Sequence, residues 1–196
     1  MPRSILSFIA IALALAGSSH PALAGEQAWV RESNRNADVL LRLMKKYSPE
    51  QAGWLGVEGA DEHIVDLNPD VDSRTRKDYL RAVAELKSRR EKTANPLVRQ
   101  DLEILIRAGE NNLRTNEVER RHMLPYYNVP RIVFTGFRAL LDAQVPKERQ
   151  AAALTRLNRY TGMAAGTKPL TTLARERTAE RIANRNLVGP DAAEVE

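Results

Sequence analysis

The chain has 196 residues, no cysteine and a formal net charge of +5. This length is typical of one domain, and the lack of cysteine excludes disulfide bonds, thiolate zinc sites and a lipid-modified N-terminal cysteine. The positive charge does not indicate a nucleic-acid partner, because basic and acidic residues are interspersed, as between Arg74 and Asp78, instead of forming one basic tract.

Residues 1–24 have the pattern of a secretory signal peptide. Arg3 precedes an apolar run at 5–16, and the run is followed by Pro21 and by small residues up to Ala24. The run is shorter than the roughly 20 residues that span a bilayer. We expect cleavage between Ala24 and Gly25, no stable membrane anchor, and a periplasmic or secreted product. An uncleaved anchor is the alternative.

Residues 25–196 predict one all-α domain of antiparallel helices. Apolar residues recur three and four positions apart at 27–47, and Ser48 before Pro49 indicates a capped helix that ends at Gly56. Residues 57–70 form an acidic loop. Further helices, joined by short turns with proline or glycine, are expected at 71–92, 96–121, 131–143, 146–161 and 169–184.

Two features of this helical pattern lead to sharper expectations. In the helix at 71–92, the side chains expected to face the core are Tyr79, Leu80, Val83 and Leu86. At the other end of the chain, residues 191–196 read as the first turn of a further helix, which six residues cannot sustain alone. We expect a chain cut short of its natural length, and a frayed terminus is the alternative.

No arrangement of residues indicates a catalytic or metal centre. His-Glu-x-x-His is absent, and Asp61, His63 and Asp66 fit no zinc spacing. Neither a Gly-x-Ser-x-Gly elbow nor a glycine-rich phosphate loop is present. Glu103 and Glu110, seven residues apart on one predicted helix, are expected to be solvated or ion-paired. We therefore expect no catalytic residue, no metal ligand and no cofactor in this chain.

The segment 122–130 is the candidate binding loop. Its two prolines exclude a regular helix, and His122, Tyr126, Tyr127 and Asn128 would present rings and hydrogen-bonding groups on a preorganised loop. The alternative is that the tyrosines fill the space between helix ends, with their hydroxyls bonded locally. The pattern favours this alternative, because irregular links between long helices need aromatic filler.

Several short motifs resemble the N-terminal part of the bacterial domain-of-unknown-function family 885. They are WLGV at 54–57 before Asp61 and Glu62, VDLNP at 65–69, QDLEIL at 100–105, HMLPYYN at 122–128, VFTGF at 133–137 and RLNRYTG at 156–162. The resemblance covers essentially all of the chain after Gly25.

The resemblance implies a function that this chain does not complete alone. Members of the family are helical and resemble zinc metallopeptidases, with a His-Glu-x-x-His helix in a C-terminal half that is not part of this sequence. The implied role is an exported scaffold that walls a substrate cleft, with a peptide substrate or that C-terminal half as partner. A complete small periplasmic binding module is the alternative.

Overall fold

A computed structural model describes residues 21–183 and 186–190 of the chain. Residues 1–20 of the expected signal peptide, and the expected helix start at 191–196, lie outside this part. Every regular element within it is a helix, which confirms the all-α class. No helix of these residues is both long and apolar enough to cross a membrane.

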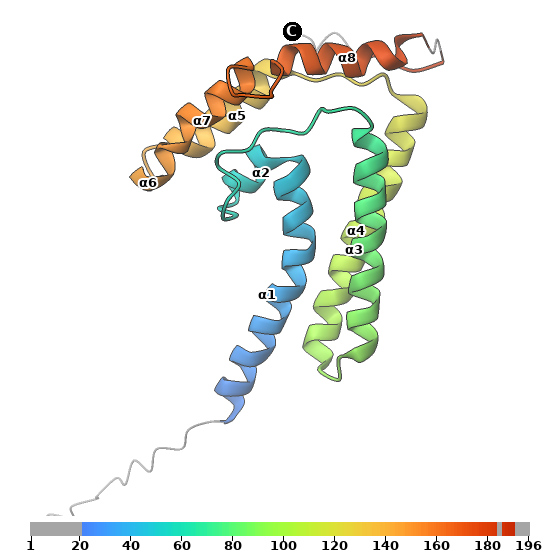
Figure 1. Ribbon diagram of the computed structural model, residues 1–196. Helices are drawn as coiled ribbons and strands as arrows, with labels where there is room; N and C mark the ends of the chain where they lie inside the picture. Colours follow the sequence, from blue (N-terminus) through green and yellow to red (C-terminus); the bar gives the residue numbers. More distant parts are fainter. Residues whose placement is uncertain (1–20, 184–185, 191–196) are drawn as a thin grey trace, which may run out of the picture.

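Eight helices follow one another in the described residues (Figure 1). Two of them, α1 and α4, have 27 residues each. The bounds are α1 Pro21–Tyr47, α2 Pro49–Trp54, α3 Val71–Lys92, α4 Pro96–His122, α5 Val129–Leu141, α6 Lys147–Gln150, α7 Ala152–Thr161 and α8 Leu170–Ile182.

These bounds correct several expectations. The helix expected at 146–161 is divided at Ala151 into α6 and α7, and α5 spans 129–141 where 131–143 was expected. α1 begins at Pro21 where a start at residue 27 was expected, so the helix includes the expected cleavage point, which these bounds do not test. Ser48 makes no side-chain capping bond. Its backbone N–H donates to the carbonyl of Met44 at 2.8 Å and extends the last turn of α1.

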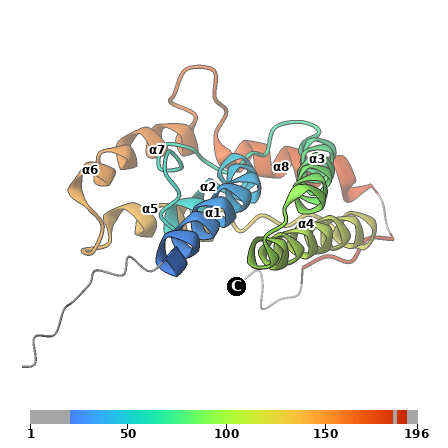
Figure 2. The ribbon, with the colours of Figure 1, turned by 90° about the horizontal axis from the view of Figure 1, so that it is seen from below.

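The first core lies between α1, α3 and α4, whose buried side chains include Val39, Leu86 and Leu102. α3 and α4 run side by side in opposite directions (Figures 1 and 2). They approach closely at Gly109 of α4, where a Cβ would lie 2.7 Å from Cγ2 of Val83. The expectation that Leu80 faces the core is wrong, since Leu80 is 49% exposed. The contact uses the stripe of Ala82, Val83 and Leu86 instead.

Ion pairs also join α3 to α4. Glu103 accepts from Arg90 at 3.1 Å, and Glu110 lies 2.6 Å from the ammonium of Lys87. The expectation that these two carboxylates are solvated or ion-paired is thereby confirmed. All four side chains are 40–51% exposed, so water and salt screen both pairs and each adds little to stability.

The second core is formed by α7, α8 and the acidic loop, with α5 packed against it. Its buried side chains are Leu67, Tyr160, Leu170, Leu173 and Ala174. Tyr127 and Phe137 are half-buried and pack on this cluster. Figure 2 shows α5, α6 and α7 on one side of the molecule, α3 and α4 on the other, and α1 and α2 between them.

Candidate functional site

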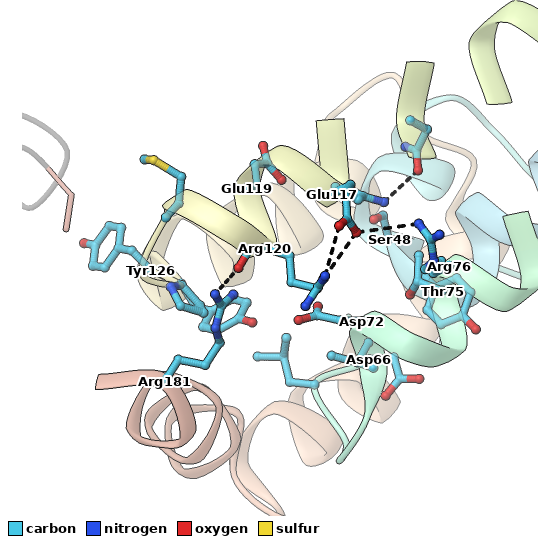
Figure 3. Close-up of a pocket in the computed structure, with 18 of the residues that line it drawn as sticks. Ser48, Asp66, Asp72, Thr75, Arg76, Glu117, Glu119, Arg120, Tyr126 and Arg181 are labelled. Atoms are coloured by element: carbon cyan, nitrogen blue, oxygen red, sulfur yellow. Dashed lines mark hydrogen bonds and ion pairs between the residues drawn. The ribbon is translucent and has the colours of Figure 1, made fainter. Parts of the chain in front are cut away.

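A cleft with a volume of about 530 Å³ lies where the two cores meet. Its walls come from the start of α3, the end of α4, the linker between α4 and α5, and α8 (Figure 3). The polar and aromatic side chains on these walls include Tyr47, Asp66, Asp72, Thr75, Arg76, Tyr79, Asn116, Glu117, Arg120, Tyr126, Tyr127 and Arg181.

The α4–α5 linker, residues 123–128, is fixed by bonds from α8 and from the segment after it. Leu124 N–H donates to the carbonyl of Val188 at 2.8 Å, and Val188 N–H donates to the carbonyl of His122 at 2.7 Å. The hydroxyl of Thr178 donates to the carbonyl of Pro125 at 2.9 Å. The linker therefore holds its side chains at the cleft on a preorganised backbone.

The structure divides the four residues of the candidate binding loop. Tyr126 and Tyr127 line the cleft, although Figure 3 shows the ring of Tyr126 pointing away from its charged centre. His122 is the exposed last residue of α4 and does not line the cleft. Asn128 is the N-cap of α5, where its side-chain oxygen accepts from Arg131 N–H at 3.0 Å. Its position favours a structural role.

Tyrosine is concentrated at the cleft. Four of the five tyrosines in the sequence line it, and only Tyr160 does not. The hydroxyl of Tyr47 donates to Asp78 at 2.8 Å. Burial raises the pKa of Tyr127 to about 12, and the nearby carboxylate of Asp72 acts in the same direction. The hydroxyl of Tyr127 therefore stays protonated at neutral pH and serves as a hydrogen-bond donor.

Charged groups of both signs face the same space. Glu117 lies between Arg120 and Arg76, whose guanidinium nitrogens are 3.0 and 3.6 Å from its oxygens (Figure 3). Hydrogen bonds from Arg120 and then Arg121 lower the pKa of Glu117 to about 2. Arg74 donates to Asp66 at 3.0 Å. Burial alone would raise the pKa of Asp66, but the bonds from Arg74 and Asn68 hold it below its ordinary value.

A smaller pocket of about 230 Å³ adjoins the cleft and shares Asp72, Arg120, Tyr127 and Arg181 with it. Arg177 of α8 lines this pocket. Its residues come from α3, α4, the linker and α8, so the smaller pocket depends on the same packing between the two cores as the cleft.

A buried polar network holds the acidic loop, which supplies Asp66 and Leu67 to the cleft. Arg156 is fully buried and donates to three backbone carbonyls, of Ala60, His63 and Gly136, at 2.8–3.0 Å. No side-chain carboxylate takes part in these bonds, so Arg156 stabilises the fold by joining the backbone of the acidic loop to that of α5.

Glu50 and Asp61 complete this network. Glu50 is buried and accepts from the hydroxyl of Tyr160 at 2.8 Å and from Val65 N–H at 3.0 Å. Both oxygens of Asp61 accept from Arg149 at 2.7 Å. The acidic loop is thus fixed by buried and half-buried bonds.

The carboxylate oxygens and the imidazole nitrogen of this loop, which are candidate metal ligands by residue type, contact arginines instead. Asp61 binds Arg149, Asp66 binds Arg74, and Nδ1 of His63 lies 3.0 Å from Arg159. Within residues 21–183 and 186–190, no three His, Asp or Glu side chains are placed to hold a metal ion.

No family model, curated protein or solved structure matches this chain. The resemblance to family 885 therefore rests on the motifs in the sequence, and the chemistry of the cleft rests on its own residues.

Sequence reasoning missed most of the cleft. Tyr47, Asp72, Glu117, Arg120 and Arg181 belong to four different helices that meet only in the folded chain. One signal was present in the sequence, since Glu117 continues the seven-residue spacing of Glu103 and Glu110 along α4. That spacing places all three glutamates on one face of the helix.

Proposed function

We propose that this protein binds short peptide segments in the cleft between its two cores. The observation that carries the proposal is the gathering of four of its five tyrosines, with charged groups of both signs, around one cleft of about 530 Å³. This volume lies within the range of pockets that take drug-sized ligands. Tyrosine offers apolar area together with a hydroxyl, which makes it frequent at binding surfaces.

The polar groups suit a polypeptide. A peptide backbone presents N–H donors and carbonyl acceptors in alternation. The cleft offers donors on Tyr127 and Arg120 and acceptors on Asp72 and Glu117. This is the role that the resemblance implies for a substrate-cleft portion of a metallopeptidase-like protein, and the proposal assigns no catalytic residue to this chain.

Exposed apolar side chains favour the scaffold role over a complete binding module. Phe134 and Leu141 of α5 and Leu154 of α7 are each 55–66% exposed. A scaffold that lacks its partner leaves such side chains exposed to solvent and binds a hydrophobic dye in its folded state. A cooperatively melting protein without dye binding would support the module instead. Zinc-dependent peptide hydrolysis by the purified chain would contradict both roles.

The proposal includes export, supported by the signal-peptide pattern of the sequence. Trp29, Asn36 and Val39 of α1 follow Gly25, so their contacts remain after cleavage at that point. N-terminal sequencing of protein from the periplasm of an expressing bacterium is expected to begin at Gly25. A periplasmic or cytoplasmic product that begins at Met1 would contradict it.

Peptide binding is tested by passing a randomised mixture of N-acetylated tetrapeptides over the immobilised protein. Retained peptides are identified by mass spectrometry and their affinities measured by calorimetry. Thr75 lines the cleft, whereas Thr115 of α4 is exposed outside it. Thr75→Trp fills the cleft and is expected to abolish retention, while the matched control Thr115→Trp keeps it. Equal retention by both variants would refute the proposal.

A further inference from the structure

Arg177 of α8 is buried, yet much of its hydrogen-bonding capacity is unused. Its side chain is 7% exposed, and its NH2 nitrogen lies 2.6 Å from Oε1 of Glu180. Its Nε and NH1 nitrogens are buried without a hydrogen-bond partner in the described part of the chain. A guanidinium has five N–H donors, and buried donors without an acceptor destabilise the folded state. This arrangement points to a missing acceptor.

Arg177 lines the smaller pocket, so an acceptor that takes the place of Glu180 would approach its nitrogens from there. Arg120 and Arg181 also line it, and each already donates to a partner of its own. Arg120 donates to Glu117 at 3.0 Å through NH2 and at 3.3 Å through Nε. Arg181 donates to the backbone carbonyl of Arg120. All three arginines make the pocket attractive to an anion, and Arg177 is the one with buried donors that lack a partner.

Acidic side chains of the pocket oppose an anion. Asp70, Asp72 and Glu180 line it, and all three are exposed. Water and salt screen exposed charges, whereas a buried guanidinium is screened much less. The buried guanidinium of Arg177 is therefore the least screened charge of the pocket, and it favours a negatively charged ligand. Glu180, whose side chain is 54% exposed, can turn into solvent when a ligand takes its place.

We propose that the smaller pocket binds a carboxylate of the peptide held in the cleft, with Arg177 as its main partner. The inference rests on the proposed peptide binding. A carboxylate that displaces Glu180 from NH2 would use this nitrogen together with NH1 or Nε, and two parallel bonds of this kind are the preferred contact between arginine and carboxylate. The carboxylate comes from the C-terminus of the peptide or from an acidic side chain.

Calorimetry with three related peptides tests the carboxylate site. The probes are the tetrapeptide retained most strongly from the mixture as its free acid, the same peptide as its C-terminal amide, and that amide with glutamate at the last position. We expect the free acid to bind about tenfold to a hundredfold more tightly than the plain amide. Recovery of affinity by the glutamate peptide identifies a side-chain carboxylate as sufficient. No recovery identifies the C-terminus.

Variants separate this site from a general effect of charge. Glu180→Gln removes the competing carboxylate and is expected to raise the affinity for the free acid several-fold, with no change for the amide. Arg177→Lys loses the two-pronged contact and is expected to reduce the preference for the acid. Arg175→Lys, on an exposed arginine of the same helix outside the pocket, is the matched control.

Two outcomes overturn the inference, and they are distinguishable. If the free acid and the amide bind equally to the unmodified protein, the carboxylate site is refuted and peptide binding stands. If no peptide is retained, the proposed function fails and this inference fails with it. Glu180→Gln keeps a side-chain oxygen that can accept from Arg177 and is therefore expected to fold, so its binding result tests the site even if Arg177→Lys unfolds the protein.

Discussion

Gly136 of α5 allows the buried contact between Tyr160 and Glu50. A Cβ at this position would overlap the hydroxyl oxygen of Tyr160 and lie 3.2 Å from Cγ of Glu50. Gly136→Ala must therefore move the Tyr160 hydroxyl away from Glu50, which it contacts at 2.8 Å in the native protein. The bond is buried, so neither group finds water as a substitute.

The expected loss follows from three contributions. Losing a hydrogen bond to a charged group costs about 1.5–3 kcal/mol, and overpacking a core costs about 1–3 kcal/mol. Alanine in a helix regains about 1 kcal/mol relative to glycine. We expect Gly136→Ala to lower the free energy of unfolding by about 1.5–5 kcal/mol in urea titrations.

A double-mutant cycle provides the control. Tyr160→Phe removes the oxygen that the new methyl group would overlap. We expect Gly136→Ala to cost much less in the Tyr160→Phe background than in the native one, with a coupling energy of at least about 1 kcal/mol. Strictly additive effects would refute the close approach of Gly136 to Tyr160.

Three further predictions concern other residues of the fold and cleft. Asn128→Ala removes the N-cap of α5 and is expected to lower the free energy of unfolding by about 1 kcal/mol in urea. Peptide affinity is expected to stay the same, and a large loss of affinity would show that Asn128 contacts the ligand. Arg149→Ala leaves the half-buried Asp61 without its two bonds, so amide hydrogen exchange is expected to become faster in residues 57–66 and to stay unchanged in α4; unchanged exchange in the loop would contradict the anchoring. Tyr127 has a folded-state pKa of about 12, raised from 10.0, so its stabilising contribution is complete below pH 10 and is lost as pH rises toward 12. In urea titrations, Tyr127→Phe is expected to reduce the decrease in the free energy of unfolding between these pH values. An identical decrease in the variant would contradict the raised pKa.

The helices could be predicted because local rules decide them. Proline at the first positions of α2, α4 and α5 and three- or four-residue apolar spacing marked their places. Leu80 was wrongly expected to face the core, because periodicity identifies the apolar face of a helix but not how much of that face the neighbouring helix covers. Whether Leu80 is buried depends on how α3 meets α4, which is a property of both helices.

The cleft could be predicted only in part. Tyr126 and Tyr127 were found because two tyrosines and two prolines stand together in one short segment. Glu50 and Arg156, which hold the acidic loop, are separated by more than half of the chain. Arg156 begins the RLNRYTG motif, but nothing in that motif indicates which groups it contacts. The pairing of both residues with Tyr160, Gly136 and the loop carbonyls arises from tertiary packing, which sequence periodicity does not encode.

Photo-crosslinking tests the central claim of peptide binding most directly. The tetrapeptide retained most strongly from the randomised mixture is made with a diazirine side chain, irradiated with the native protein, and the crosslinked residues are mapped by mass spectrometry. We predict crosslinks to the start of α3, the end of α4 and the α4–α5 linker, which together line the cleft, and their loss in Thr75→Trp. Crosslinks confined to the exposed apolar side chains of α5 and α7 would contradict the account.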